Sequence, residues 1–191
     1  MKKTLLTFSA LFLLASPAMA ASPYVSANVG LGLPGNSGDS YGNVISYKTS
    51  VPFGGAVGLI GDGYRVEAAL GHVTNDVDQR NGVSLSGDKI SFFSYMANAY
   101  YDFDIKGYGF LPYTMWGIGG VSISPNAPDL NISTNKPVFA WQLGAGIGVK
   151  AAQNVVFDLG YRYFKPSAYK DNGNNVTFSS SNILLGMRYN F

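Results

Sequence analysis

Residues 138–150, VFAWQLGAGIGVK, decide the fold, because large apolar side chains alternate there with glycine and polar residues at every second position. The apolar positions are Phe139, Trp141, Leu143, Ala145, Ile147 and Val149, and they alternate with Gln142, Gly144, Gly146, Gly148 and Lys150. Successive side chains of a β-strand point to opposite faces, so the stretch predicts a strand with one wide apolar face and one narrow polar face. The first face suits lipid, and the second suits the packed interior of a small barrel.

The same period of two recurs along the chain between Tyr24 and Phe191. The clean segments are 23–33, 64–70, 90–104, 138–150, 155–164 and 182–191. In segment 90–104 the two faces are predicted not to mix, with Phe93, Tyr95, Ala97, Ala99, Tyr101 and Phe103 outward and Ser94, Asn98 and Asp102 inward. Segments 52–60 and 110–123, which have glycine and apolar residues on both faces, complete a predicted set of eight strands.

The N-terminus has the pattern of a secretory signal. Two lysines precede an apolar run over residues 5–15, and the small-residue triplet Ala-Met-Ala follows at 18–20. This order predicts cleavage after Ala20, which assigns residues 1–20 to a signal peptide and residues 21–191 to one exported domain. The apolar run is shorter than the roughly 20 residues that a membrane-spanning helix needs, which disfavours an uncleaved anchor.

The composition excludes several classes of protein. Without Lys2 and Lys3, eleven of the thirteen Lys and Arg residues remain against eleven Asp and Glu, so the exported domain is formally neutral. With no Lys/Arg cluster either, no nucleic-acid partner is predicted. The chain has no Cys, which excludes disulfides and thiolate metal sites, and we predict neither a cofactor nor a metal.

The exported domain has no apolar run long enough for a helical span, so it must cross a membrane, if at all, with strands. Strands in lipid must close into a barrel, because lipid offers no hydrogen-bonding partner to a free sheet edge. The predicted fold class is therefore all-β: a monomeric, eight-stranded antiparallel transmembrane up-and-down β-barrel surrounded by outer-membrane lipid.

Alternating lengths of the predicted connections indicate an orientation. The short connections are 61–63, 104–109 and 151–154, and the long ones are 34–51, 72–89, 124–136 and 165–181. Outer-membrane barrels keep short turns in the periplasm and long loops outside, so both termini are expected to be periplasmic. The four long loops are rich in Asn, Ser, Gly and Asp, and they are where a host surface ligand would bind.

Seven charged residues fall on inward faces of the predicted strands. They are Arg65, Glu67, Asp102, Lys150, Asp158, Arg162 and Arg188. A charge inside a narrow barrel must be paired or hydrated, and eight strands leave an interior just wide enough for side chains to fill. We predict an internal salt-bridge network. The alternative is an ion path, for which we expect negligible conductance of anything larger than small ions.

The glycine clusters and the aromatic residues are predicted to have structural roles. The glycine clusters at 117–120 and 144–148 lie within strands and lack the helix and acidic residue of a nucleotide-binding unit, so they are predicted to make room for bulky lumenal neighbours. Aromatic residues at the level of the lipid are predicted to form interfacial girdles. These residues are Tyr24, Tyr101, Phe103, Trp141, Tyr161, Tyr163, Tyr189 and Phe191.

The sole histidine, His72, raises an enzymatic alternative. It begins the sequence His-Val-Thr-Asn, where a strand is predicted to meet its loop. This sequence is loosely similar to the His-x-Ser-Asn motif of barrel lipid A deacylases, in which case Thr74 would be an activated hydroxyl. The motif lies early in the chain, lacks the serine and has no second histidine, whereas a triad needs three converging groups. We therefore predict no catalytic residue.

Several stretches resemble the small outer-membrane barrels of the opacity-protein and surface-antigen family, with the eight-stranded OmpA/OmpX-like fold. They are YRVE at 64–67, MANAYYDF at 96–103, Pro-Tyr at 112–113, DLGYRY at 158–163 and LGMRYNF at 185–191. The resemblance implies a surface antigen, adhesin or structural component of the outer membrane of a Gram-negative bacterium, with a small porin-like channel as the alternative. It also implies that Phe191, with Tyr189, is the signal that the barrel-assembly machinery reads.

Overall fold

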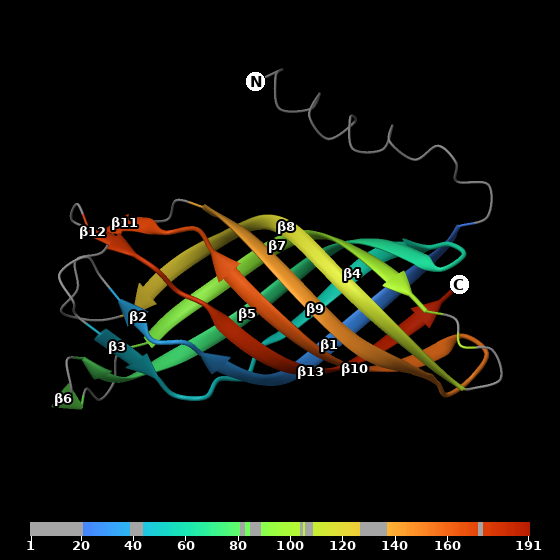
Figure 1. Ribbon diagram of the computed structural model, residues 1–191, viewed down its shortest axis with the longest axis horizontal. Helices are drawn as coiled ribbons and strands as arrows, with labels where there is room; N and C mark the ends of the chain where they lie inside the picture. Colours follow the sequence, from blue (N-terminus) through green and yellow to red (C-terminus); the bar gives the residue numbers. More distant parts are fainter. Residues whose placement is uncertain are drawn as a thin grey trace, which may run out of the picture.

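Eight strands close into a barrel in this computed structural model, which describes residues 21–38, 44–80, 83–84, 89–103, 105, 109–126, 137–171 and 174–191. The barrel strands are β1 (Ser22–Pro34), β4 (Phe53–Ile60), β5 (Tyr64–Arg80), β7 (Lys89–Asp102), β8 (Phe110–Asn126), β9 (Val138–Lys150), β10 (Val155–Pro166) and β13 (Ser180–Asn190). Each pairs antiparallel with the next barrel strand along the chain, and β1 pairs with β13 to close the ring (Figure 1). The prediction of an all-β, eight-stranded antiparallel up-and-down barrel is confirmed.

Side chains divide between the outside and the lumen as the alternation predicts. On β1, Leu31 is 55% exposed, whereas Tyr24 on the other face is 1% exposed. On β13, Leu185 is 63% exposed and Arg188 is 1% exposed. Large apolar residues therefore cover the outside, which is the surface that an outer-membrane barrel presents to lipid. Among the described residues, no helix is long and apolar enough to cross a membrane.

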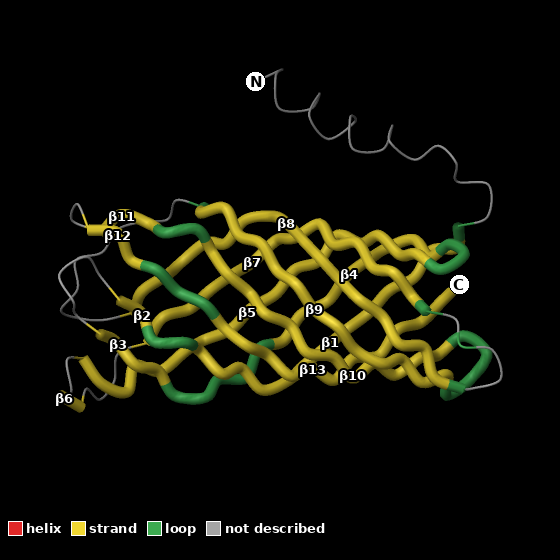
Figure 2. The backbone as a smooth tube through the Cα atoms, viewed as in Figure 1, coloured by secondary structure: helices red, strands yellow, loops and turns green. Residues whose placement is uncertain are grey.

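The short connections lie at one end of the barrel, and the long connections leave from the other (Figure 2). Gly63 has a φ of 74°, a conformation that favours glycine, and it lets the chain reverse between β4 and β5. The backbone N–H of Phe191 donates to the carbonyl of Pro23 (3.0 Å), so β1 begins beside the C-terminal residue, at the end with the short turns. We call this the periplasmic end, and the opposite one the outer end, following the orientation of such barrels.

Strands extend past the predicted loop boundaries at the outer end. β5 pairs with β7 as far as Asp76 opposite Lys89, so the prediction that a loop begins at His72 is wrong. Backbone pairing with β7 carries β5 outward, although its side chains become polar. Shorter strands accompany these extensions: β2 (Ser37–Gly38), β3 (Val44–Tyr47), β6 (Val83–Ser84), β11 (Tyr169–Asp171) and β12 (Asn174–Val176). β3 and β6 pair with β5, β2 pairs with β3, and β11 and β12 form a hairpin.

An apolar cluster fills the outer half of the lumen. We call it the apolar plug, and it consists of Phe92, Met96, Val121, Ile123, Ala140 and Phe178. Phe92 and Met96 are buried on the inward face of β7, so the prediction that the two faces of segment 90–104 do not mix is wrong. Near the outer end the inward face of β7 carries Phe92 and Met96 on either side of Ser94, and from Asn98 to the periplasmic end it carries polar groups. The filled lumen therefore buries apolar side chains as well as polar ones.

Candidate functional site

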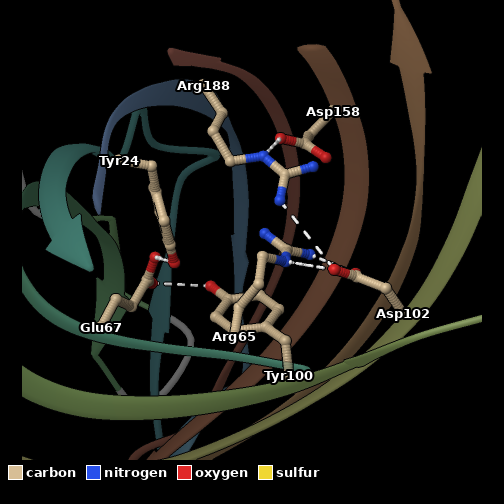
Figure 3. A network of polar contacts seen from close by, with 7 residues as sticks. All are labelled: Tyr24, Arg65, Glu67, Tyr100, Asp102, Asp158 and Arg188. Carbon is tan, nitrogen blue, oxygen red and sulfur yellow. Dashed lines mark hydrogen bonds and ion pairs between the residues drawn. The ribbon is translucent and has the colours of Figure 1, made fainter. Parts of the chain in front are cut away.

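The periplasmic half of the lumen contains a group of buried and half-buried polar side chains. We call it the polar network, and it consists of Tyr24, Arg65, Glu67, Tyr100, Asp102, Asp158 and Arg188 (Figure 3). These residues lie on β1, β5, β7, β10 and β13, close to the short turns or the chain ends that define the periplasmic end. Their side chains converge because each occupies an inward position of its strand.

Glu67 is the acceptor for three donors in the polar network. Its carboxylate accepts hydrogen bonds from the hydroxyls of Tyr24 and Tyr100, both at 2.7 Å, and from Nδ2 of Asn98 at 2.8 Å. Asn98 in turn accepts a hydrogen bond from Nε2 of Gln142 at 2.6 Å. Hydrogen bonds to an ionised group are stronger than those between neutral groups. Neutral donors therefore hold Glu67 in place from β1, β7 and, through Asn98, β9.

Arg65 and Asp102 form the tightest ion pair of the network. Arg65 Nε lies 2.8 Å from Oδ2, and Nη2 donates to Oδ1 at 2.8 Å, which is the two-pronged geometry that suits guanidinium and carboxylate. The guanidinium carbon also lies 4.1 Å from the ring centre of Tyr100 and 5.0 Å from that of Tyr113. The pair therefore links β5 to β7, and the two rings cover the cation.

Arg188 is held more loosely. Its Nε lies 3.9 Å from Oδ2 of Asp158, and its Nη1 lies 4.0 Å from Oδ2 of Asp102. These distances permit ion pairing but exceed those of hydrogen bonds. Arg188 Nε and Nη1 and Asp158 Oδ1 are buried without a hydrogen-bonding partner among the described residues. Arg188 therefore acts as a shared counter-charge for two carboxylates rather than as half of a tight pair.

The structure brings together five of the seven charged residues predicted for the lumen: Arg65, Glu67, Asp102, Asp158 and Arg188. Arg162 lines a cavity with Glu67 and Asp158 and makes no ion pair within 4.0 Å among the described groups. Lys150 does not join them, because it is the last residue of β9 and its side chain is exposed. Among the described residues, three arginines thus face three carboxylates in the lumen, so these six side chains carry no net formal charge.

Sequence reasoning missed the tyrosines of the network. Tyr24 was assigned to an aromatic girdle, which is wrong, because its side chain is buried and donates to Glu67. The signal is present in the alternation, because Tyr24 has the same parity as the polar Ser26 and Asn28 and the opposite parity to the exposed Leu31. Tyr100 likewise shares the parity of Asn98 and Asp102.

The other predicted girdle residues lie on the outside of the barrel. Tyr101 packs edge-on against Phe103 with ring centres 5.0 Å apart, and Tyr189 packs edge-on against Phe191 at 5.1 Å, both at the periplasmic end. Trp141 and Tyr163 lie 5.7 Å apart on β9 and β10, nearer the outer end. Their amphipathic rings suit the two levels at which lipid meets water.

A small cavity adjoins the polar network. It has a volume of about 50 Å³ and is lined by groups from several strands, including Glu67, Met115, Asp158 and Arg162. A cavity of this size holds a few water molecules when polar groups face it. The arrangement can hydrate the charges of the lumen. Within the described residues, no group of three or more His, Cys, Asp or Glu side chains could hold a metal ion.

Glycines of the predicted clusters make room for lumenal side chains. A Cβ atom on Gly146 would lie 2.5 Å from the hydroxyl oxygen of Tyr113, and a Cβ on Gly160 would meet the same oxygen at 2.5 Å. Real Cβ atoms essentially never approach another atom this closely, so a larger residue at either position would have to displace the Tyr113 ring. The prediction that the glycine clusters accommodate bulky neighbours in the lumen is confirmed at Gly146, and Gly160, which lies outside those clusters, makes room for the same ring.

His72 lies on the outside of the barrel wall, away from the polar network. Its ring lies 5.4 Å from that of Phe53, which is 54% exposed, and its Nε2 lies 3.4 Å from Oγ1 of Thr74. Thr74 is also 2.9 Å from Oγ of Ser91. The carboxylate of Asp76, farther along β5, pairs with Lys89 at 3.6 Å. Backbone pairing between β5 and β7 thus places these polar side chains in a row that runs toward the outer end of the barrel. The carboxylate of Asp76, the imidazole of His72 and the hydroxyl of Thr74 do not converge as a catalytic triad requires.

Comparison with solved structures shows the same architecture in outer-membrane proteins. Neisserial surface protein A (NspA) is 21% identical, with a TM-score of 0.68, over 90% of this chain and 99% of that one. Outer membrane protein W of E. coli is 13% identical, with a TM-score of 0.56, over 91% and 100%. Ail of Yersinia pestis, the attachment invasion locus protein, is 18% identical, with a TM-score of 0.50, over 89% and 99%. Comparison with curated proteins gave no match.

A sequence-family model supports the same assignment more directly. The model described as outer membrane protein beta-barrel domain matches residues 6–191, which is nearly the whole chain. The match agrees with the closed ring of strands, their apolar outer surface and the polar network inside. The chain belongs to the outer membrane protein beta-barrel domain family, and its place is the bacterial outer membrane.

Proposed function

We propose that this protein is a surface antigen or adhesin, in which the barrel is the anchor and the four long connections are the part that binds a host surface ligand. The observation that carries the proposal is the filled lumen. The apolar plug occupies its outer half, and the polar network occupies its periplasmic half. A filled interior favours display of loops over passage of solutes.

The arrangement of the outer end supports this proposal. β5 and β7 pair as far as Asp76 and Lys89, and β8 continues to Asn126 beside β7. These extensions carry the connections away from the apolar band that faces lipid. Exposed polar side chains such as Lys48 and Gln79 lie on this end. A rigid support for exposed loops is what a binding surface needs.

Two structural relatives are described by roles of this kind. NspA is named as a surface protein, and Ail was solved in complex with the heparin analogue sucrose octasulfate. These statements concern those proteins. They support testing host cells, matrix and sulfated polysaccharide as the first ligands. We further propose that residues 1–20 are removed on export, that the protein is a monomer, and that Phe191 and Tyr189 engage the barrel-assembly machinery.

The test is replacement of the outer tips of the connections in a non-adherent bacterium that expresses the protein. Residues 39–43, 81–88, 127–136 and 169–176 are replaced one group at a time by Gly/Ser linkers of equal length, which spares the apolar plug. We expect at least one replacement to lower binding to host cells, matrix or heparin about tenfold, because exposed loops carry function on a rigid scaffold.

Each variant is first checked for heat-modifiable mobility on gels, which shows that the barrel has folded. Replacement of the short turn at 151–154 is the matched control, and it should leave binding unchanged. The proposal fails if the unmodified protein binds no better than an empty vector. It also fails if the variant with all four tips replaced binds as well as the unmodified protein.

A further inference from the structure

We propose that Phe178 is a stopper that closes the outer mouth of the lumen. Phe178 lies between β12 and β13 and is not part of the barrel wall. Its side chain is nevertheless only 5% exposed, while the preceding residue, Thr177, is exposed. Burial of an aromatic ring from a connection means that the ring has left the surface and entered the mouth of the barrel.

Two rings hold Phe178 in that position. It stacks on Phe92 of β7 with ring centres 4.7 Å apart and an angle of 19° between the planes. Tyr47 of β3 meets it edge-on at 5.7 Å and 87°. The next residue, Ser179, accepts a hydrogen bond through its backbone carbonyl from the N–H of Gly35 at 2.8 Å. Phe178 is therefore fixed between the barrel wall and two segments outside it.

Apolar side chains of the barrel wall pack against the stopper, although the buried polar Asn75 lies opposite Ile90 in the same part of the lumen. Val121 and Ala140 are fully buried, and Met96 is 6% exposed. Along β8, the plug residue Val121 lies six positions nearer the outer end than Met115, which lines the polar cavity. The plug thus separates that cavity from the outer surface. Apolar constrictions block ions and water, because water leaves narrow passages that offer it no hydrogen bonds.

The absence of native cysteine allows a direct test of the seal. Ala140→Cys places a single thiol of similar size in the plug, and the protein is studied in lipid nanodiscs. The probe is a small, positively charged, membrane-impermeant methanethiosulfonate reagent. Thr177→Cys provides the reference rate for an exposed thiol. We expect Cys at 140 to react much more slowly than Cys at 177 while Phe178 is present.

Removing the stopper should open the mouth. Adding Phe178→Ala to Ala140→Cys should raise the rate of reaction at least about tenfold, because an open mouth admits water and a charged reagent. Phe178→Leu should give an intermediate rate. If Phe178→Ala yields no heat-modifiable protein, the rate with Phe178→Leu is the test of the stopper. Phe53→Ala, which removes a ring of the same size from the lipid-facing side, is the matched control and should leave the rate unchanged.

Three outcomes would overturn the stopper. One is a thiol at 140 that reacts as fast as the thiol at 177 with Phe178 in place. Another is a rate that neither Phe178→Ala nor Phe178→Leu raises in heat-modifiable protein. The third is equal acceleration by Phe53→Ala, which would indicate general loosening of the barrel. None of these outcomes depends on whether the loops bind a host ligand.

Discussion

Replacing Arg65 by methionine is expected to lower the free energy of unfolding of the barrel by about 3–5 kcal/mol, as removal of one partner from a buried ion pair does. The side chains of Arg65 and Asp102 are 4% and 11% exposed and lie 2.8 Å apart at their closest atoms. Methionine fills part of the space but leaves Asp102 with only the looser contact to Arg188 at 4.0 Å. The measurement is urea unfolding in lipid, followed by the gel mobility of unheated samples.

Two companion variants make this result specific to the ion pair. Lys150→Met removes an exposed positive charge and should change the free energy of unfolding by no more than about 0.5 kcal/mol. The double variant Arg65→Met/Asp102→Leu should be more stable than Arg65→Met alone, because it leaves no uncompensated buried charge. If the double variant is no more stable than the single one, an unpaired Asp102 is not the cause of the loss.

Glu67→Ala is expected to lower the free energy of unfolding by about 3 kcal/mol or more, since it leaves several buried donors without an acceptor. Tyr24, Asn98 and Tyr100 all donate to this carboxylate, at 2.7–2.8 Å. The same urea titration measures the loss.

Tyr24→Phe is the graded comparison for Glu67→Ala. It removes one of the three hydrogen bonds and keeps the ring, so it should cost about 1.5 kcal/mol. Glu67→Gln keeps an acceptor oxygen and the shape of the side chain, and it should fall between the alanine variant and the unmodified protein. Equal losses for Glu67→Ala and Tyr24→Phe would contradict the view that Glu67 is the centre of the network.

Alternation alone was enough to predict the strands and most of their inward positions. Arg65, Glu67 and Asp158 were placed in the lumen because each alternates with large outward residues. The same rule gives Tyr24 an inward position, and its assignment to a girdle followed from residue type instead of parity. Lys150 has inward parity too, but it lies at the end of its strand, where a flexible side chain reaches water.

The apolar plug was not predictable in the same way. An apolar residue can lie on either face of a barrel strand, because a filled lumen buries it as effectively as lipid does. Phe178 lies in a stretch rich in Asn and Ser, which indicates an exposed loop by composition. Only the stacking on Phe92 and the edge-on contact with Tyr47, both distant in the sequence, bring its ring into the barrel.

The most direct test of the central claim, a barrel that displays its long connections on the cell surface, is antibody labelling of inserted epitopes. One epitope is inserted after Asp129, in a long connection, and another after Ala152, in a short turn at the periplasmic end. Both proteins must remain heat-modifiable. The account predicts labelling of intact cells only for the epitope after Asp129, with the epitope after Ala152 detected once the outer membrane is permeabilised. Labelling of intact cells through the epitope after Ala152 would contradict the account. So would the absence of labelling of intact cells for the epitope after Asp129.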